Sequence, residues 1–201
     1  MNRTAFPIVV SGPSGVGKST IARRVLEEDA GTAYSVSVTT RPPRYNEEHC
    51  AHYEFVPDER FDELIESGEL AEWAVVHGFR YGTRRCVIDE IAASGKNVVM
   101  DVDIQGGMSI KKLYPESVLV FILPPSREVL EARLRGRATD DADVIETRLR
   151  NAVNELDWAD RYDHRVVNDD LDEAVRATLE IVKKERQARS ERGEAPTAPA
   201  D

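Results

Sequence analysis

Apolar runs rich in β-branched residues recur along the chain between polar, turn-rich segments. Such runs predict strands that are buried on both sheet faces, because a strand with no solvent-facing side is apolar throughout. We expect strands at residues 6–10, 34–40, 53–56, 98–103, 118–123 and 164–168.

Between these runs lie stretches with apolar residues three and four positions apart, which predict amphipathic helices. Lys18–Glu28 is one of them, and Ser126 is a good N-cap for another. The remaining helices are expected at residues 61–67, 81–93, 126–135, 143–160 and 171–189. Strands that alternate with helices predict an α/β fold with a mostly parallel sheet covered on both faces.

Composition narrows the class of protein. The 201 residues suit one compact domain, and the net charge of −10 argues against binding to nucleic acid or to an anionic membrane surface. Cys50 and Cys86 form neither a disulfide framework nor a metal-binding spacing. With no apolar run long enough for a signal peptide or a membrane span, we expect a cytoplasmic protein. The oligomeric state stays open.

The segment between residues 11 and 20, SGPSGVGKST, contains a glycine-rich phosphate loop. It follows a predicted strand and precedes a predicted helix, which is the context that the G-x-x-x-x-G-K-[ST] motif requires. Its backbone amides and the helix N-terminus form an anion site, Lys18 reaches the β- and γ-phosphates, and Ser19 offers a hydroxyl to Mg²⁺. The predicted ATP-binding residues are Gly12, Pro13, Ser14, Gly15, Val16, Gly17, Lys18, Ser19 and Thr20.

Acidic residues end the predicted strand at residues 98–103. Asp101 and Asp103 are two positions apart, so both would lie on one face if the strand continues. Beside a triphosphate site, a carboxylate here is expected to hold the water shell of Mg²⁺ or to contact substrate. Mg²⁺ is therefore the predicted cofactor.

Arginines occur in two further segments. Arg41 and Arg44 flank Pro42 and Pro43, and the prolines keep this stretch extended, so two guanidinium groups are presented to a phosphate at little entropic cost. Arg133, Arg137 and Arg148 lie in a lid-like segment that could close over polyphosphate and exclude water.

Taken together, the chain resembles the guanylate kinase family over residues 7–182. The resemblance rests on GPSGVGKST, SVSVTTRPPR, EWAVVHG with YGT, DVDIQG, the LPPS turn, RLRGR and VVNDDL, which occur in family order. It implies a P-loop NTPase-type sheet with inserted nucleotide-monophosphate and lid subdomains. The implied core comprises residues 1–36, 91–125 and 152–189, the GMP-binding subdomain 37–90, the lid 126–151 and a disordered tail 190–201.

The resemblance also implies roles for individual residues. Asn168 would lie against the adenine of ATP, Asp101 would support Mg²⁺ through water, and Glu47 would organise the loop after the paired arginines. The catalytic residues would be Lys18, Arg41, Arg133, Arg137 and Arg148. The GMP phosphate would be held by Arg41, Arg44, Tyr53 and Tyr81, and the base read by Ser37, Glu72, Thr83 and Asp103.

The chemistry of guanine makes a carboxylate such as Glu72 a sensible reader of the base. Guanine presents N1–H and the exocyclic amine as adjacent donors, whereas adenine would leave the carboxylate facing a lone pair. The hydroxyls of Ser37 and Thr83 could donate to O6. The expected reaction is transfer of the ATP γ-phosphoryl group to GMP, and to dGMP.

Departures from the family pattern lie near the acceptor site, at Asn46, Cys50, His52, Phe79 and Arg80. Two alternatives stay open beside the guanylate kinase resemblance. One is a kinase of the same fold that acts on another phosphorylated acceptor, such as a ribose bisphosphate-type sugar phosphate. The other is a non-catalytic interaction module, which the intact Lys18 and Ser19 argue against.

Overall fold

A parallel sheet forms the centre of the molecule. The computed structural model describes residues 5–44, 48–49, 53–76, 78–135 and 142–192. For residues 142–145, 147–149 and 192 it describes the backbone only. Within these residues, five strands run in the order β2-β7-β1-β8-β9, and every neighbouring pair is parallel. Their bounds are Thr32–Tyr34, Asn97–Asp101, Pro7–Ser11, Val118–Leu123 and His164–Val167 in that order. This confirms the predicted sheet.

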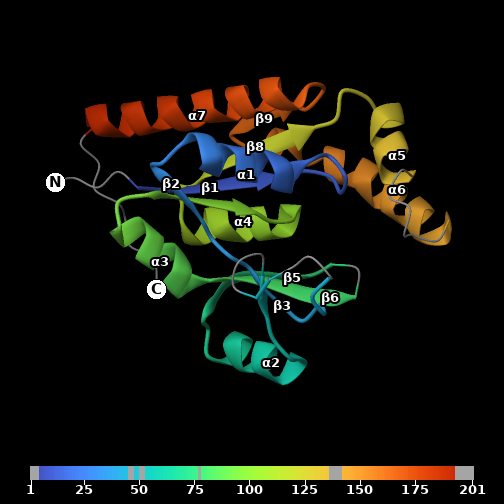
Figure 1. Ribbon diagram of the computed structural model, residues 1–201, viewed down its shortest axis with the longest axis horizontal. Coiled ribbons are helices and arrows are strands. Elements are labelled where there is room, and N and C mark those ends of the chain that lie inside the picture. The colour runs from blue at the N-terminus through green and yellow to red at the C-terminus, as the bar shows by residue number, and fades with distance from the viewer. Residues whose placement is uncertain (1–4, 45–47, 50–52, 77, 136–141, 193–201) are drawn as a thin grey trace.

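Helices cover both faces of this sheet, because side chains along a strand point alternately to its two sides. On β1, Ile8 and Val10 join the core cluster beneath α1 (Lys18–Glu28) and α7 (Leu171–Arg192). Val9 joins the cluster on the opposite face, beneath α3 (Arg85–Ala93) and α4 (Ile104–Leu113). Figure 1 shows the two helical layers above and below the sheet.

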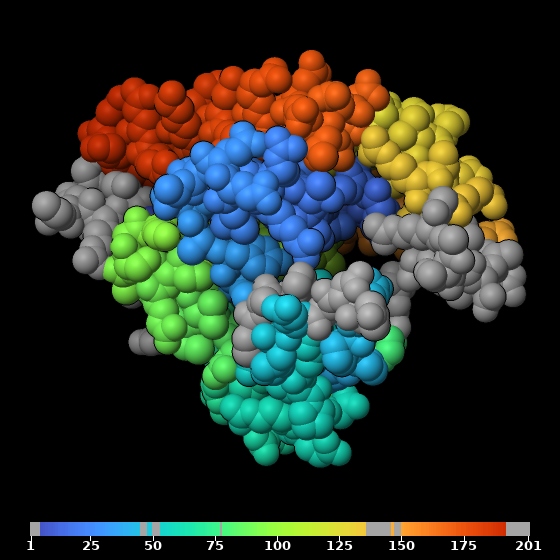
Figure 2. Space-filling model, in the orientation of Figure 1, coloured from blue at the N-terminus to red at the C-terminus, as the bar shows by residue number. Residues whose placement is uncertain are grey.

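A smaller lobe is inserted between β2 and α3. Its strands run in the order β4-β3-β6-β5, with bounds Glu54–Phe55, Val38–Thr39, Phe79–Arg84 and Leu70–Val76. Together with α2 (Asp58–Glu66), they enclose a separate small core of Val38, Phe61, Leu64 and Leu70. The lobe hangs below the central sheet (Figure 1), and it appears in cyan and turquoise at the bottom of Figure 2.

Two helices project beside the carboxyl ends of the central strands. They are α5 (Arg127–Arg135) and α6 (Ala142–Leu156), and a short 3-10 turn at Ala159–Arg161 leads from α6 to β9. The backbone N–H of Val129 donates to the Ser126 hydroxyl at 3.3 Å, which confirms the predicted N-cap. The pair forms the right-hand edge of the molecule in Figure 1.

Several elements differ from those that the pattern predicts. Residues 34–40 do not form one strand, because the chain passes from β2 in the large sheet to β3 in the small one. Residues 81–84 belong to strand β6, so the helix expected from 81 begins at Arg85. Strand β5 and helix α4 were not predicted, since β5 lacks a clean alternation and α4 contains two adjacent glycines.

At the C-terminus, α7 continues to Arg192, three residues into the segment expected to lack structure, and residues 193–201 lie outside the description. Nowhere in the described residues is there a helix with both the length and the apolar character to cross a membrane.

Candidate active site

A cavity of about 1250 Å³ opens at the carboxyl ends of β1 and β7, between the central sheet, the small lobe and α6. In parallel α/β sheets this edge is where ligands bind, because loops and helix N-termini converge there. The structure brings many predicted site residues to this one cavity. They are Gly12, Ser14, Lys18, Ser19, Ser37, Arg44, Tyr53, Tyr81, Asp101 and Asp103.

The phosphate loop has the backbone shape that its glycines allow. Gly17 is the N-cap of α1 with φ 101°, a left-handed conformation that glycine adopts without strain. Gly12 has φ 140°, and a Cβ at this position would lie 2.4 Å from the carbonyl oxygen of Ile122. The ammonium of Lys18 donates to the carbonyls of Gly12 at 2.7 Å and Pro13 at 3.0 Å. The lysine charge is thus held at the mouth of the loop.

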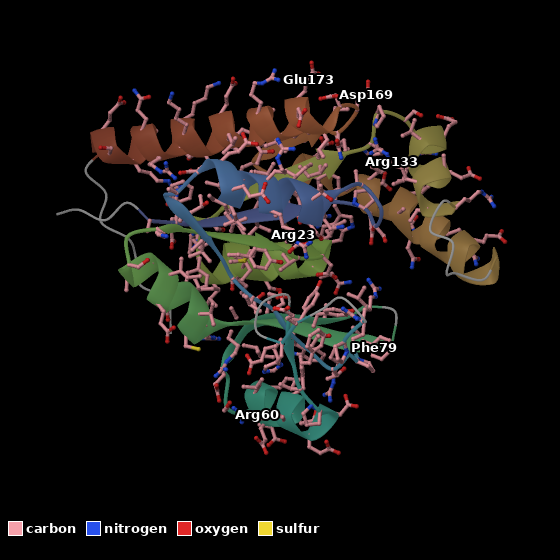
Figure 3. All side chains as sticks on the ribbon, in the orientation of Figure 1. Arg23, Arg60, Phe79, Arg133, Asp169 and Glu173 are labelled. Atoms are coloured by element: carbon pink, nitrogen blue, oxygen red, sulfur yellow. The ribbon has the colours of Figure 1, made fainter. Side chains whose placement is uncertain are left out.

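Asn168 fixes this loop from behind. Its side-chain amide donates to the carbonyl of Val16 at 2.7 Å, and its backbone carbonyl accepts from Arg133 at 3.1 Å. Asn168 is 5% exposed, and neither residue lines the cavity. Figure 3 shows Arg133 between α5 and the end of the central sheet. The two residues therefore join α5 and the end of β9 to the phosphate loop.

Ser19 and Asp101 form the pair that could support a cation. The Ser19 hydroxyl donates to Asp101 Oδ2, and the Tyr34 hydroxyl donates to Asp101 Oδ1. A serine hydroxyl and a carboxylate are hard oxygen donors, the kind that Mg²⁺ takes in small number beside substrate phosphates and water. The donor set at the mouth of the loop fits Mg²⁺ in this respect.

Asp103 has a different position from the one that a continuous strand would give it. Strand β7 ends at Asp101, and Asp103 caps α4 by accepting from the backbone N–H of Gly106 at 2.7 Å. Burial raises the pKa of Asp103, although the Gly106 bond and the charge of Lys18 act in the opposite direction. Both acids nevertheless line the cavity.

Glu72 and Thr83 are paired across the β5–β6 hairpin. The Thr83 hydroxyl donates to Glu72 Oε1 at 2.5 Å, and Glu72 is only 8% exposed. Burial raises the pKa of Glu72 to about 7, with a further contribution from the negative charge of Asp103, while the Thr83 bond lowers it. A Cβ on Gly106 would lie 2.6 Å from Glu72 Oε2, so the carboxylate packs directly against the first turn of α4.

Arg41 is held by aromatic residues of the small lobe. Its Nε donates to the hydroxyl of Tyr81 at 3.1 Å, and its guanidinium carbon lies 5.4 Å from the centre of the Tyr53 ring. Tyr53 and Tyr81 meet edge to face at 5.9 Å and line the cavity, whereas Arg41 is 9% exposed and lies behind them. Arg44 reaches the cavity itself.

Residues on one face of α6 line the cavity, and the sequence pattern did not assign them to the site. Glu155 Oε2 accepts from the backbone N–H of Ser14 in the phosphate loop at 3.2 Å. Burial raises the pKa of Glu155, although nearby Lys18 lowers it. Asn151, Asn154 and Glu155 of α6 line the cavity together with Trp158, which follows the helix, and the spacing of three and four residues within α6 is the signal that could have identified this face.

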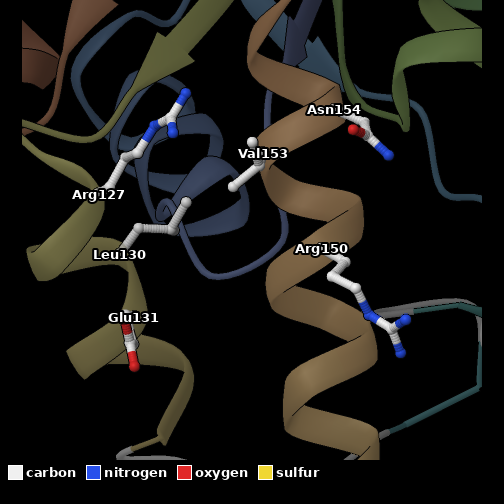
Figure 4. A pocket seen from close by; sticks show the side chains of 6 residues that line it. All are labelled: Arg127, Leu130, Glu131, Arg150, Val153 and Asn154. Carbon is white, nitrogen blue, oxygen red and sulfur yellow. The ribbon is translucent and has the colours of Figure 1, made fainter.

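A second, smaller cavity of about 450 Å³ lies between α5 and α6. Figure 4 shows Leu130 of α5 and Val153 of α6 pointing into the space between the two helices, and Arg127, Glu131 and Arg150 also line the cavity. Asn154 lines both cavities, so the two are neighbours across α6.

The remaining predicted residues divide into two groups. Pro13, Gly15 and Val16 complete the phosphate loop, and Thr20 is exposed in the first turn of α1. Glu47 and Arg137 lie outside the described residues, as does the side chain of Arg148, whose backbone is in α6.

Comparisons with known proteins place the chain in a family. The family model described as guanylate kinase matches residues 4–185. A guanylate kinase of Gloeobacter violaceus is 48% identical over 178 residues, covering 89% of this chain and 87% of its own. One from Mesorhizobium japonicum is 46% identical over 193 residues, covering 96% and 88%.

Among solved structures, guanylate kinase from Anaplasma phagocytophilum superposes with a TM-score of 0.74 at 31% identity, covering 90% of this chain and 86% of that one. A gluconokinase from Sinorhizobium meliloti, with a TM-score of 0.54 at 18% identity, shares the fold alone.

Proposed function

The chain belongs to the guanylate kinase family, and from this premise we propose that it transfers the γ-phosphoryl group of ATP to GMP, and to dGMP, with Mg²⁺. The observation that carries the proposal is the single cavity that joins Lys18 and Ser19 of the phosphate loop to Arg44, Tyr53 and Tyr81 of the small lobe. A donor and an acceptor bound at its two ends would face each other.

The phosphate loop is the proposed donor site. Its amides and Lys18 would bind the β- and γ-phosphates, and the short chain of contacts from Arg133 through Asn168 to Val16 would keep the loop in shape. Ser19 and Asp101 would hold Mg²⁺, which when bound neutralises charge on the phosphates. Arg133, Arg137 and Arg148 keep their proposed roles over the transferring group, and Asn168 keeps its proposed place against the adenine of ATP.

The small lobe is the proposed acceptor site. Arg44, Tyr53 and Tyr81 would bind the GMP phosphate, with Arg41 supporting the tyrosines and adding positive charge. Glu72 and Thr83, already bonded to each other, and Ser37 and Asp103 would read the base. A buried carboxylate is suited to two adjacent donors, so this pair favours guanine over a sugar phosphate that lacks a base.

The proposed subdomains correspond to these donor and acceptor sites. Residues 37–90 would move with the acceptor, residues 126–151 would form the lid, and the rest would hold ATP. Phosphoryl transfer needs positioning and charge neutralisation rather than a covalent nucleophile, which is what these residues offer. We place the reaction in the cytoplasm, the compartment that the amino-acid composition favours.

The test is a coupled assay of ADP release with ATP and Mg²⁺ against GMP, dGMP, AMP, CMP, UMP and ribose phosphates. We expect turnover with GMP and dGMP and little with the others. The Lys18→Ala variant should lose turnover by at least about a hundredfold, because it loses charge stabilisation of the transferring group, while calorimetry still detects GMP binding.

Turnover only with a ribose phosphate would replace this function by the sugar-phosphate alternative. No turnover with any acceptor would favour the non-catalytic module. Equal loss of GMP binding and turnover in Lys18→Ala would remove the lysine from the proposed donor role.

A further inference from the structure

Tyr34 ends strand β2 beside the phosphate loop, and neither the sequence pattern nor the proposed reaction assigns it a role. In the parallel pairing of β2 with β7, Tyr34 lies opposite Val99, two residues before Asp101. Side chains two apart on a strand share a face, so Tyr34 and Asp101 project to the same side of the sheet, the side that carries α1. The register therefore brings a tyrosine hydroxyl to a carboxylate at the cavity.

The contact itself divides the Asp101 carboxylate between two donors. Tyr34 donates to Oδ1 and Ser19 donates to Oδ2. The three residues come from β2, β7 and the first turn of α1, so the arrangement joins three elements. A carboxylate bonded through both oxygens has little freedom to rotate about its terminal torsion.

The Tyr34 ring is itself held in place. It packs against the core cluster formed by α1, α7 and the central strands. A tyrosine has only two side-chain torsions that move its ring, so packing of the ring fixes the direction of its hydroxyl. Tyr34 can thus act as a rigid support for Asp101.

By holding Asp101, Tyr34 also affects the orientation of the Ser19 hydroxyl. A hydroxyl that donates its proton keeps both oxygen lone pairs for other partners. With Asp101 held by Tyr34, the Ser19 proton points toward Asp101, and the lone pairs of Ser19 are left for a cation at the cavity. The order of contacts is therefore Tyr34 to Asp101 to Ser19.

We propose that Tyr34 is a positioning residue for the cation pair, holding Asp101 so that Ser19 is oriented before the metal–nucleotide complex binds. This inference deepens the proposed function, because it rests on ATP binding with Mg²⁺ at the phosphate loop. It does not depend on which acceptor is used.

The test compares binding of ATP with and without Mg²⁺ by isothermal titration calorimetry, with excess EDTA in the second case. Tyr34→Phe keeps the ring and removes the hydroxyl. We expect its affinity for Mg·ATP to fall about fivefold, the typical effect of losing one intramolecular hydrogen bond, with unchanged affinity for metal-free ATP and for GMP. The Mn²⁺ concentration that half-saturates the protein in the presence of ATP, measured by electron paramagnetic resonance, should rise by the same factor.

Tyr114→Phe is the matched control. Tyr114 is 4% exposed, and its hydroxyl contacts Asp89 at 3.4 Å in the cluster on the opposite face of the sheet. Its removal should leave every affinity unchanged. Asp101→Asn supplies a double-mutant cycle: because Tyr34 acts through Asp101, adding Tyr34→Phe to Asp101→Asn should change Mg·ATP affinity by less than about twofold.

The proposal is overturned if Tyr34→Phe leaves the ratio of Mg·ATP to metal-free ATP affinity unchanged. It is also overturned if both affinities and that for GMP fall together, including through unfolding detected by circular dichroism, since that would mark a structural role. Failure of the acceptor assay would contradict the proposed function without affecting this ratio.

Discussion

At the scale of single residues, Glu72 is the group of the candidate site whose ionisation should respond most to pH near neutrality. Its carboxylate is buried between β6 and α4, accepts one hydrogen bond from Thr83, and faces the negative charge of Asp103. Burial favours the neutral acid, and its pKa is raised to about 7. A guanine edge would supply two donors to the ionised form, so ligand binding and ionisation are linked.

This linkage predicts that GMP binds more tightly as pH rises through 7. With a pKa of about 7, roughly a tenth of Glu72 is ionised at pH 6 and roughly nine tenths at pH 8. The KM for GMP should therefore fall roughly five- to tenfold from pH 6 to pH 8. Steady-state kinetics of Glu72→Gln provide the control, because titration of the GMP phosphate remains in both proteins.

The stability of the ligand-free protein should change with pH in the direction opposite to the affinity for GMP. The pKa of this acid is higher in the folded state, about 7, than the ordinary value of 4.5 that it has in an unfolded chain, so the folded protein binds more protons between these values. The contribution of Glu72 to stability is full below pH 4.5 and is lost as pH rises toward 7. Urea unfolding should show wild type weakening relative to Glu72→Gln over this window; parallel pH profiles in both assays would exclude a buried, titrating Glu72.

At the scale of elements, the phosphate loop depends on a contact that comes from far along the chain. Gly17 has φ 101°, and a Cβ there would lie 2.6 Å from the side-chain nitrogen of Asn168. That nitrogen donates to Val16, so the loop and the end of β9 are packed with no room for a methyl group. Glycine is needed at Gly17 both for its backbone angle and for this space.

Comparison of Gly17→Ala with Gly95→Ala separates the cost of the left-handed backbone from the loss of space beside Asn168. Both glycines have positive φ, but a Cβ on Gly95 would meet nothing within 4 Å. We expect each variant to lose about 1 kcal/mol of unfolding free energy from the left-handed backbone. Only Gly17→Ala should also displace Asn168 and weaken ATP binding, by at least about tenfold in calorimetry. Equal ATP affinities in the two variants would show that the Asn168 contact is unimportant for the loop.

At the scale of the whole molecule, the small lobe has its own core, and Arg80 is one of the arginines that join its elements. Arg80, a departure from the family pattern, forms ion pairs with Asp58 and Asp62 of α2 and lies 4.9 Å over the Phe61 ring. Its backbone also bonds Thr40, next to Arg41. Arg80 thus connects α2 to the strand that leads into the proposed phosphate-binding loop.

Replacement of Arg80 by Ala should loosen the lobe without affecting the central sheet. We expect faster hydrogen exchange in α2 and β3 and a KM for GMP raised about threefold, with the KM for ATP unchanged, because the lobes have separate cores. Arg60→Ala is the control, since Arg60 makes an exposed pair with Glu63 within α2 and such pairs contribute little. Exchange that increases equally in both lobes would contradict independent behaviour.

Much of the central sheet could be predicted because buried strands such as β8 are apolar throughout, a signal that is local in sequence. The small lobe was predicted less completely. Residues 53–56 and 34–40 were expected to be extended and contain β4 and β3. Strand β5 was missed because it lacks a clean alternation, and residues 81–84 of β6 were expected to begin a helix. Tyr34 and Glu155 were missed for a different reason, since their partners are 67 and 141 residues away.

The sequence by itself determined the phosphate loop, the α/β alternation and the paired arginines, because each depends on residues that are neighbours along the chain. The tertiary structure decided which groups share a cavity, that Asp103 caps a helix, and that Glu72 is buried enough to titrate near 7. Burial and electrostatic environment are sums over residues that only folding brings together, so no local pattern contains them.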